Sequence, residues 1–243
     1  ADRTAAREIM ITTIAGLLAG IGHVAVGASS PIPAAGAMLA RQRDPSMRIS
    51  ILGSARHNFF TNGSAELFDA AGQGRIGAFF LGGGQIDGEG NVNLVGAGGY
   101  PQSRVRWPGS FGSAYLYYIV PRVILFREEH SRRVFVPRVD FISAAGASPE
   151  GTYRPGGPHA LLTPLCLFDF DRERRRFRLR SVHPGHTLEE VRDQTGFDFD
   201  RPDQVPTTPA ADDATLAILY GPVRAALAGG YPEFSESMGR ATA

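Results

Sequence analysis

Hydrophobic positions along the chain alternate between two spacings, and this alternation predicts helices interleaved with short buried strands. Helices are expected at residues 5–19, 34–43, 64–71 and 110–119. Strands are expected at residues 23–27, 48–52, 78–81, 91–95, 122–126, 133–136 and 141–144. Alternation of this kind, with short glycine turns, is typical of an α/β fold. We therefore expect an open, mainly parallel sheet with helices on both faces.

The pattern changes after a loop at residues 145–159 that is rich in Gly and Pro. Residues 161–170 and 176–182 are expected to form a β-hairpin around a charged turn. The sequence TLEE at Thr187–Glu190 is a capping box, which should open a helix that Gly196 ends. The C-terminal part of the chain therefore adds a hairpin and helices to the main sheet.

The C-terminal segments are predicted with less regular structure. Residues 202–209 are interpreted as a linker, and residues 212–228 as a final amphipathic helix. The tail at about 229–243 is expected to be poorly ordered. The length of 243 residues fits one large α/β domain or two small ones, and we expect residues 1–243 to form a single domain.

Glycine is concentrated between Gly77 and Pro101. After the buried strand at 78–81 comes a triple-glycine turn at Gly82–Gly84, and after the strand at 91–95 a second cluster contains Gly96, Gly98 and Gly99. Because glycine lacks a Cβ, its backbone can approach a ligand closely and present bare N–H groups to a polarised oxygen. Two tight connections in an ordinary sheet explain the same spacing equally well.

Composition and charge exclude several classes of function. Formal net charge is +1, which gives no reason to expect a nucleic-acid partner. All 25 basic Lys and Arg residues are arginine, so neither a Schiff-base lysine nor a Walker lysine is present. Cys166 is the only cysteine, which rules out an internal disulfide and a cysteine metal cluster. Its apolar surroundings in the sequence predict a buried structural thiol.

Residues 9–28 are apolar enough to raise the question of a membrane span. Thr12, Thr13, His23 and several glycines interrupt the segment, and it lacks a basic region followed by a small-residue cleavage site. We interpret it as a helix, a break at Gly20–Gly22 and a buried strand. With neither a membrane span nor a targeting signal expected, we predict a cytoplasmic protein.

Two loops are candidate ligand sites. The turn containing Ser29 and Ser30 leads from a strand into a helix N-terminus, where anions bind readily, although a simple capped helix start is the more common case. Arg56, His57 and Asn58 follow a buried strand end, a frequent location of functional residues in open α/β sheets. His57 is a candidate acid–base group, with a solvent-facing loop histidine as the plainer interpretation.

Other polar residues are interpreted as structural. His183 and His186 lack a carboxylate at a metal-site spacing, so we assign them no ligand role and expect no metal. The arginines between Arg172 and Arg180 alternate with acidic residues, as in a solvated hairpin. A dinucleotide fingerprint is rejected because the glycine pattern precedes its strand instead of following it.

The chain contains no GxSxG, HExxH or CxxC motif and no glutamate on a strand-end turn. Asp87 and Glu89 are the only carboxylates close in sequence to the glycine clusters. Glycine turns suited to a ligand, without a recognisable nucleophile, indicate half of an active site, with the remainder on a partner chain.

A series of motifs resembles the β subunit of class I CoA-transferases of the glutaconate CoA-transferase type. In chain order they are VGASSPIPAAGAMLARQ, AFFLGGGQIDGEGNVN, VRWPGSFG, RRVFVPRVDFISAAG, LFDFD and LRSVHPGHTLEEVRDQTGFDFD. The resemblance runs from about Ile9 to Asp200. It implies the CoA-transferase fold and a pairing with a homologous α subunit, expected as α2β2. It also implies acyl-CoA as substrate, with coenzyme A part of that substrate and no permanently bound cofactor.

The resemblance also assigns the candidate site. The loop Gly96-Ala97-Gly98-Gly99 is similar to the one that offers backbone N–H groups to the thioester oxygen. Further contacts with the acyl-CoA are then expected from Ser29, Ser30, Arg56, His57, Asn58, Gly83, Gln85 and Tyr100.

One departure from the family pattern bears on the reaction. Transferases of this type carry a glutamate nucleophile in a VYE[SA]G-like turn, whereas the matching segment here, Ile49–Ser54, contains no glutamate. Without that carboxylate there is no covalent carrier for CoA exchange. The chain therefore looks more like the β subunit of the CoA-transferase-like hydrolases that open the last steroid ring in bacterial cholesterol catabolism.

That resemblance implies hydrolytic C–C cleavage of a cyclic β-oxoacyl-CoA, with the essential glutamate on the α subunit. Ring opening needs a base to activate water and an oxyanion site for the developing enolate, and this chain would supply the latter. A CoA-transferase using another carboxylate and a scaffold subunit without catalytic residues are the alternatives.

Overall fold

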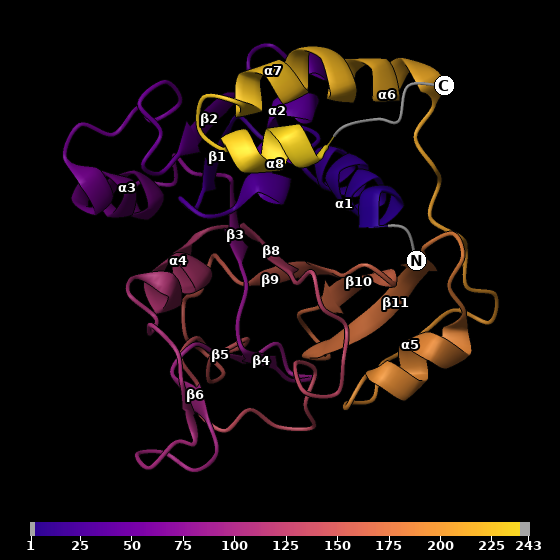
Figure 1. The fold of residues 1–243 in the computed structure, drawn as a ribbon. Coiled ribbons are helices and arrows are strands. Elements are labelled where there is room, and N and C mark those ends of the chain that lie inside the picture. The colour runs from indigo at the N-terminus through magenta and orange to yellow at the C-terminus, as the bar shows by residue number, and fades with distance from the viewer. Residues whose placement is uncertain (1–2, 239–243) are drawn as a thin grey trace. The chain divides into compact units, whose positions relative to one another are not determined.

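The computed structural model describes residues 3–238, and its contacts cluster into two compact units. Residues 3–67, 75–78 and 210–238 make up the first unit, and residues 68–74 and 79–209 the second. Two elements cross this division, the helix α3 (Gly63–Gly72) and the strand β3 (Ala78–Leu81) (Figure 1).

The first unit contains helices from both ends of the chain around two parallel strands. Its elements are α1 (Arg3–Leu17), β1 (His23–Val26), α2 (Pro31–Arg43), β2 (Arg48–Ile51), α6 (Asp213–Ile218), the π-helical turn η1 (Leu219–Val223), α7 (Arg224–Leu227) and α8 (Pro232–Ser237). In the β1–β2 pair Val24 lies opposite Ile49, and both side chains are fully buried. Apolar side chains of α1 and α2 complete this core.

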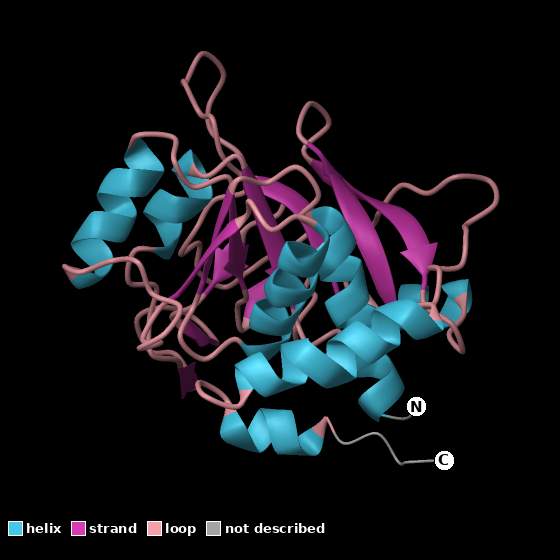
Figure 2. Cartoon of the chain, turned by 90° about the horizontal axis from the view of Figure 1, so that it is seen from above, coloured by secondary structure: helices cyan, strands magenta, loops and turns pink. Residues whose placement is uncertain are grey.

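The second unit contains the remaining strands and two helices. Its elements are β4 (Gln85–Ile86), β5 (Val92–Asn93), β6 (Gly96–Ala97), β7 (Val105–Arg106), α4 (Ser113–Ile119), β8 (Arg122–Phe126), β9 (Pro158–Leu162), β10 (Cys166–Asp171), β11 (Arg176–Val182) and α5 (Leu188–Gln194). Strands lie in the order β11, β10, β9, β8, β3. The β8–β9 pair is parallel, whereas β10 is antiparallel to both its neighbours. Figure 2 shows the strands in magenta and the helices in cyan.

The predicted fold class is confirmed: the protein is α/β, with a mainly parallel sheet and an antiparallel hairpin near the C-terminus. Several predicted strands are wrong in extent. Residues 133–136 and 141–144 make only single bridges, Ile86 to Phe135 and Val92 to Ala144. The predicted strand at 161–170 is two strands, because Pro164 interrupts it and the Thr163 hydroxyl accepts the Leu165 N–H in a tight turn.

The C-terminal helix differs most from its prediction. Residues 212–228 form α6, η1 and α7 in sequence, and the π-helical turn contains Pro222. Proline has no N–H to donate and its ring collides with the preceding turn, so the regular hydrogen-bond ladder cannot continue there. The expected poorly ordered tail instead carries α8 at Pro232–Ser237, while residues 239–243 lie outside the described part.

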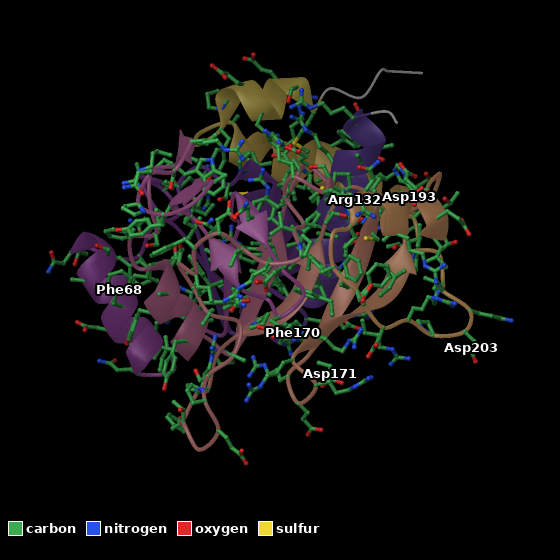
Figure 3. All side chains as sticks on the ribbon, turned by 90° about the horizontal axis from the view of Figure 1, so that it is seen from below. Phe68, Arg132, Phe170, Asp171, Asp193 and Asp203 are labelled. Carbon is green, nitrogen blue, oxygen red and sulfur yellow. The ribbon has the colours of Figure 1, made fainter. Side chains whose placement is uncertain are left out.

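Helix α5 begins as the capping box predicts. The Thr187 hydroxyl accepts the Glu190 N–H at 3.1 Å, but the Glu190 carboxylate bonds to His186 instead of returning to the cap. At the other end, Arg132 donates its Nε–H to the Asp193 carbonyl at 2.6 Å (Figure 3). A side chain from outside the helix therefore satisfies one of its last carbonyl groups.

Close packing of α1 on α2 depends on Gly36. A Cβ at this position would lie 2.3 Å from Cγ2 of Ile14, which is completely buried. We predict that Gly36→Ala lowers the free energy of unfolding by about 1–2 kcal/mol, because overpacking exceeds the gain of about 1 kcal/mol in helix propensity. Urea denaturation measures the change. In the control Gly16→Ala on α1, an added Cβ meets no atom within 4 Å, so stability should be unchanged or slightly higher; equal effects at both sites would contradict this account.

Two histidines of the second unit, the buried His183 and the half-buried His130, lie in a network of threonine hydroxyls. His183 bonds through Nε2 to the Thr163 carbonyl at 3.0 Å and through Nδ1 to the Thr208 hydroxyl at 2.8 Å. His130 lies between the hydroxyls of Thr163 and Thr195, at 2.8 and 2.9 Å. Burial lowers the pKa of both histidines to about 4. Cys166 is fully buried beside this network, and burial raises the pKa of its thiol, as expected for a structural cysteine.

The lowered pKa values predict acid sensitivity. Between pH 6.5 and pH 4 the unfolded histidines bind protons that the folded ones do not, so stability present above pH 6.5 is lost as the pH falls toward 4. We predict that His183→Gln is less stable at pH 7 but loses less stability over this range, by about 2–3 kcal/mol. Denaturant titrations at several pH values measure the free energy of unfolding of both proteins. Parallel curves of this free energy against pH would refute the assignment of the acid sensitivity to His183.

Candidate functional site

The glycine-rich run of the second unit forms two very short ladders. Strand β4 pairs with β5, and β6 pairs with β7, in both cases over two residues of each strand. In the triple-glycine turn, a Cβ on Gly83 would lie 2.4 Å from Val92, and one on Gly84 would lie 2.2 Å from Trp107. Close packing therefore accounts for these two glycines. Gly83 is buried, and a contact with substrate there stays a prediction.

Three polar side chains hold the second glycine cluster in place. The Asn93 amide donates to Oε1 of Gln85 and to the Gly96 carbonyl, both at 2.8 Å. Its Oδ1 accepts the backbone N–H groups of Val95 and Gly96 at 3.0 and 3.3 Å. Gln85 in turn donates to Asp140 at 3.0 Å. Because Asn93 is fully buried and Gln85 nearly so, water cannot easily replace these bonds.

Asp140 completes the arrangement. Its Oδ2 accepts the Gly98 N–H at 2.8 Å as well as the Gln85 amide, and its own N–H donates to Gln85 Oε1 at 3.0 Å. Sequence reasoning missed this residue, since it named only Asp87 and Glu89 as nearby carboxylates. Asp87 is instead a buried turn residue that accepts backbone N–H groups, for example from Asn91 at 3.0 Å.

The three glycines of the predicted oxyanion loop differ in what they can offer a ligand. Gly96 approaches its partner strand so closely that a Cβ would lie 2.3 Å from the Val105 carbonyl. Gly98 has φ +81°, a conformation that favours glycine, and its N–H is already bonded to Asp140. The Gly99 N–H makes no hydrogen bond within residues 3–238, and a Cβ there would meet no atom within 4 Å. Gly99 is therefore the loop position with both a free donor and open space.

Tyr100 follows the loop, and the residue is 56% exposed. Its ring packs against that of Phe141, with the ring centroids 4.9 Å apart. The structure thus places Gly83, Gln85, the glycine loop and Tyr100 in the second unit, and their contact with substrate stays a prediction.

The other predicted ligand residues lie in the first unit. Strand β2 ends at Ile51, and the chain turns at Gly53, which has φ +79°. The turn is closed by Ile51 N–H donating to the His57 carbonyl at 2.7 Å and by His57 N–H donating to the Ser54 hydroxyl at 3.1 Å. Asn58 accepts the Phe60 N–H at 3.2 Å, so its amide has a local structural role.

His57 is the titratable group of this turn. Burial, and then the positive charges of Arg41 and Arg56, lower its pKa from the ordinary value. Its Nε2 is buried without a hydrogen-bond partner in the described part of the chain. The ring borders a pocket of about 150 Å³ that the turn after β2 forms with residues 226–231. Ser30 stands at the N-cap of α2 without a side-chain capping bond, so the capped-start interpretation does not account for it.

The described residues carry neither a metal cluster nor a membrane helix. Residues 3–238 contain no group of three or more His, Cys, Asp or Glu side chains able to hold a metal ion. Within the same residues, every helix is too short or too polar to cross a bilayer.

Residues 8–194 match the Coenzyme A transferase family. The chain belongs to this family. It is 34% identical over 152 residues to a 3-oxoadipate CoA-transferase subunit of Pseudomonas knackmussii, covering 60% of this chain and 58% of that protein. It is 33% identical over 137 residues to the cholesterol ring-cleaving hydrolase IpdB subunit of Rhodococcus jostii, covering 55% and 53%. The matched region spans little more than half the length of either relative.

Two solved structures have a fold similar to that of this chain. The decarboxylase AibA/AibB has a TM-score of 0.78 at 23% identity, covering 96% of this chain and 98% of that one, and so shares the fold. Rhodococcus jostii IpdAB has a TM-score of 0.77 at 25% identity, covering 89% and 93%. The predicted family resemblance is confirmed for this CoA-transferase-family chain.

The Asp140 contact yields a prediction that does not require a known substrate. Asp140→Ala removes the acceptor of the Gly98 N–H, and a hydrogen bond to a charged group contributes about 1.5–3 kcal/mol. We therefore expect the Gly98 amide to exchange with solvent deuterium at least about tenfold faster. Asp203→Ala is the matched control, since Asp203 is an exposed carboxylate of the same unit (Figure 3). Equal exchange in wild type and Asp140→Ala would contradict the positioning role.

Proposed function

We propose that this chain is the β subunit of a heteromeric enzyme that opens the ring of a cyclic β-oxoacyl-CoA by hydrolysis. The observation that carries the proposal is the turn after β2. At the position of the transferases' glutamate it has Leu52 and Gly53, which line an apolar pocket instead of presenting a carboxylate. A chain without that carboxylate cannot form the acyl-enzyme that CoA transfer requires.

The proposed step balances as the addition of water. A base takes a proton from water, and the resulting hydroxide oxygen bonds to the ring carbonyl carbon. The bond from that carbon to the α-carbon then breaks, and its electron pair becomes the enolate of the thioester. Protonation of the α-carbon by the base completes the reaction. The product is a ring-opened carboxylic acid that keeps its CoA.

Within this proposal the second unit stabilises the enolate. The free Gly99 N–H is the donor, and the bond from Gly98 to Asp140 fixes the loop that carries it. A preorganised donor of this kind lowers a barrier by about 3 kcal/mol. The base belongs to a homologous α subunit, and the assembly is α2β2, a common symmetric form. No cofactor is bound permanently, and the place of the reaction is cholesterol degradation in the cytoplasm.

A CoA-transferase β subunit is the second candidate. The observation that favours it is the 34% identity to a protein named as a 3-oxoadipate CoA-transferase subunit. Such an enzyme would need a carboxylate from elsewhere as its carrier, and would move CoA between two carboxylic acids.

The test uses the chain copurified with its α partner, given a cyclic β-oxoacyl-CoA in water enriched in heavy oxygen. We expect a ring-opened product that keeps CoA and carries solvent oxygen in its new carboxylate, read by mass spectrometry. An intact ring, with CoA moved to an added carboxylic acid and a carboxylate trapped as a CoA thioester, would overturn the proposal in favour of the transferase. Full activity of an intact complex carrying Gly98→Val would favour a scaffold role, since φ +81° and contact with Arg104 forbid a normal loop there.

A further inference from the structure

A polar pocket in the second unit is lined by arginine side chains. Its volume is about 390 Å³, and every lining residue belongs to that unit. The exposed residues Arg132, Arg192 and Arg201 line it together with residues 195–199, the irregular segment that follows α5. The pocket is therefore built by one part of this chain, and we call it the arginine pocket.

The arginine pocket has an excess of positive charge. Three arginines line it, against the single carboxylate of Asp198. None of the three guanidinium groups forms an ion pair within residues 3–238. Arg132 donates instead to the Asp193 carbonyl at 2.6 Å (Figure 3). Arg201 donates to the Pro202 carbonyl at 3.1 Å. Because these carbonyl groups carry no net charge, the arginines are held in place without being neutralised.

The segment 195–199 is fixed near its start and has unused donors beyond it. Gly196 donates its N–H to the Phe135 carbonyl at 2.8 Å, and a Cβ on Gly196 would lie 2.3 Å from that oxygen. The backbone N–H groups of Phe197, Asp198 and Phe199 make no hydrogen bond within residues 3–238. Backbone donors without a partner and arginines without a counter-ion both favour an oxygen-rich anion.

The lining also includes an aromatic residue. Phe199 is half-buried, and its ring packs edge-on against the buried Phe168, with the ring centroids 5.0 Å apart. Aromatic side chains of this kind stack with the flat bases of nucleotides. A volume of about 390 Å³ is within the range of small-molecule sites and exceeds what one phosphate group needs.

We propose that the arginine pocket binds a phosphorylated nucleotide. Arg132, Arg192 and Arg201 bind its phosphate oxygens, since the planar guanidinium matches phosphate geometry, and Phe199 stacks with its base. This chemistry has two sources, a free nucleotide and the nucleotide end of a CoA thioester. The inference goes beyond the proposed function and does not rest on it, because binding is measured without turnover.

Calorimetric titration of the full chain copurified with its partner measures the binding, with adenosine 3′,5′-bisphosphate as the probe. Arg192→Gln removes a charge-assisted hydrogen bond, so the Kd for the bisphosphate should rise at least about tenfold. Since Arg192 is exposed, this variant should keep the urea unfolding curve of wild type.

Arg178→Gln is the matched control, because Arg178 is an exposed arginine of β11 outside the pocket. It should leave the Kd for the bisphosphate within about threefold of wild type. The proposal would be overturned by the absence of saturable binding to wild type, by an unchanged Kd in Arg192→Gln, or by an equal rise in both variants.

Phe199→Leu tests the stacking contact, with inorganic pyrophosphate as a second probe. Leucine keeps an apolar side chain against Phe168 but offers no ring to a base. The Kd for the bisphosphate should rise at least about fivefold while that for pyrophosphate stays within about threefold, since only the bisphosphate has a base. Equal losses for the two probes would overturn the assignment of the base to Phe199.

Acetoacetyl-CoA separates the two sources. If the nucleotide end of CoA occupies the pocket, acetoacetyl-CoA displaces the bisphosphate, and Arg192→Gln raises its Kd at least about tenfold. If the pocket takes a free nucleotide, both ligands bind wild type together, and the Kd for acetoacetyl-CoA stays within about threefold in Arg192→Gln. Either result supports a site for a phosphorylated nucleotide. Ring opening is measured separately, so its failure would overturn the hydrolase and leave the arginine pocket standing.

Discussion

The structure around the glycine loop depends on buried side-chain amides replacing a β-ladder. Strands of two residues form very few backbone hydrogen bonds. The backbone N–H and C=O groups that stay unpaired must still find hydrogen-bond partners when they are buried. Asn93 and Gln85 supply the missing donors and acceptors, and Asp140 extends the network to Gly98. Glycine alone would leave this segment flexible; the network gives it a defined conformation.

The two glycine clusters illustrate that one residue type can serve two physical purposes. Gly83 and Gly84 are required because neighbouring side chains occupy the space of their Cβ atoms. Position 98 requires glycine because of its backbone angle. Neither reason applies at Gly99, because the space around it is open. Close packing at the first cluster fixes the strand pair from which the second cluster projects. The plain interpretation of the glycine run therefore accounts for Gly83 and Gly84, whereas the functional interpretation of the second cluster stays a prediction.

The first unit builds its pocket from segments far apart in the sequence. The turn after β2 supplies one side, and the C-terminal residues 226–231 supply the other. The π-helical turn at Pro222 precedes this wall and ends the regular helix before it. A helix continued from Asp213 without that interruption would follow a different path, so a local backbone irregularity contributes to the shape of the pocket.

The sequence by itself determined the α/β class, the family and most helices and long strands, because these follow from periodic burial and local motifs. It also indicated that Cys166 and His183 are structural, and that the loop at Gly96–Gly99 could present backbone donors. Only the tertiary structure revealed Asp140 as the partner of Gly98, since a contact across 42 positions leaves no local pattern. For the same reason it alone placed residues 226–231 beside His57, where the sequence predicted the end of a helix at 228 and a poorly ordered tail from about 229. Secondary-structure preferences depend on neighbouring residues in the sequence, whereas the hydrogen bonds of Asp140 and the pocket beside His57 arise from packing between residues far apart in the sequence.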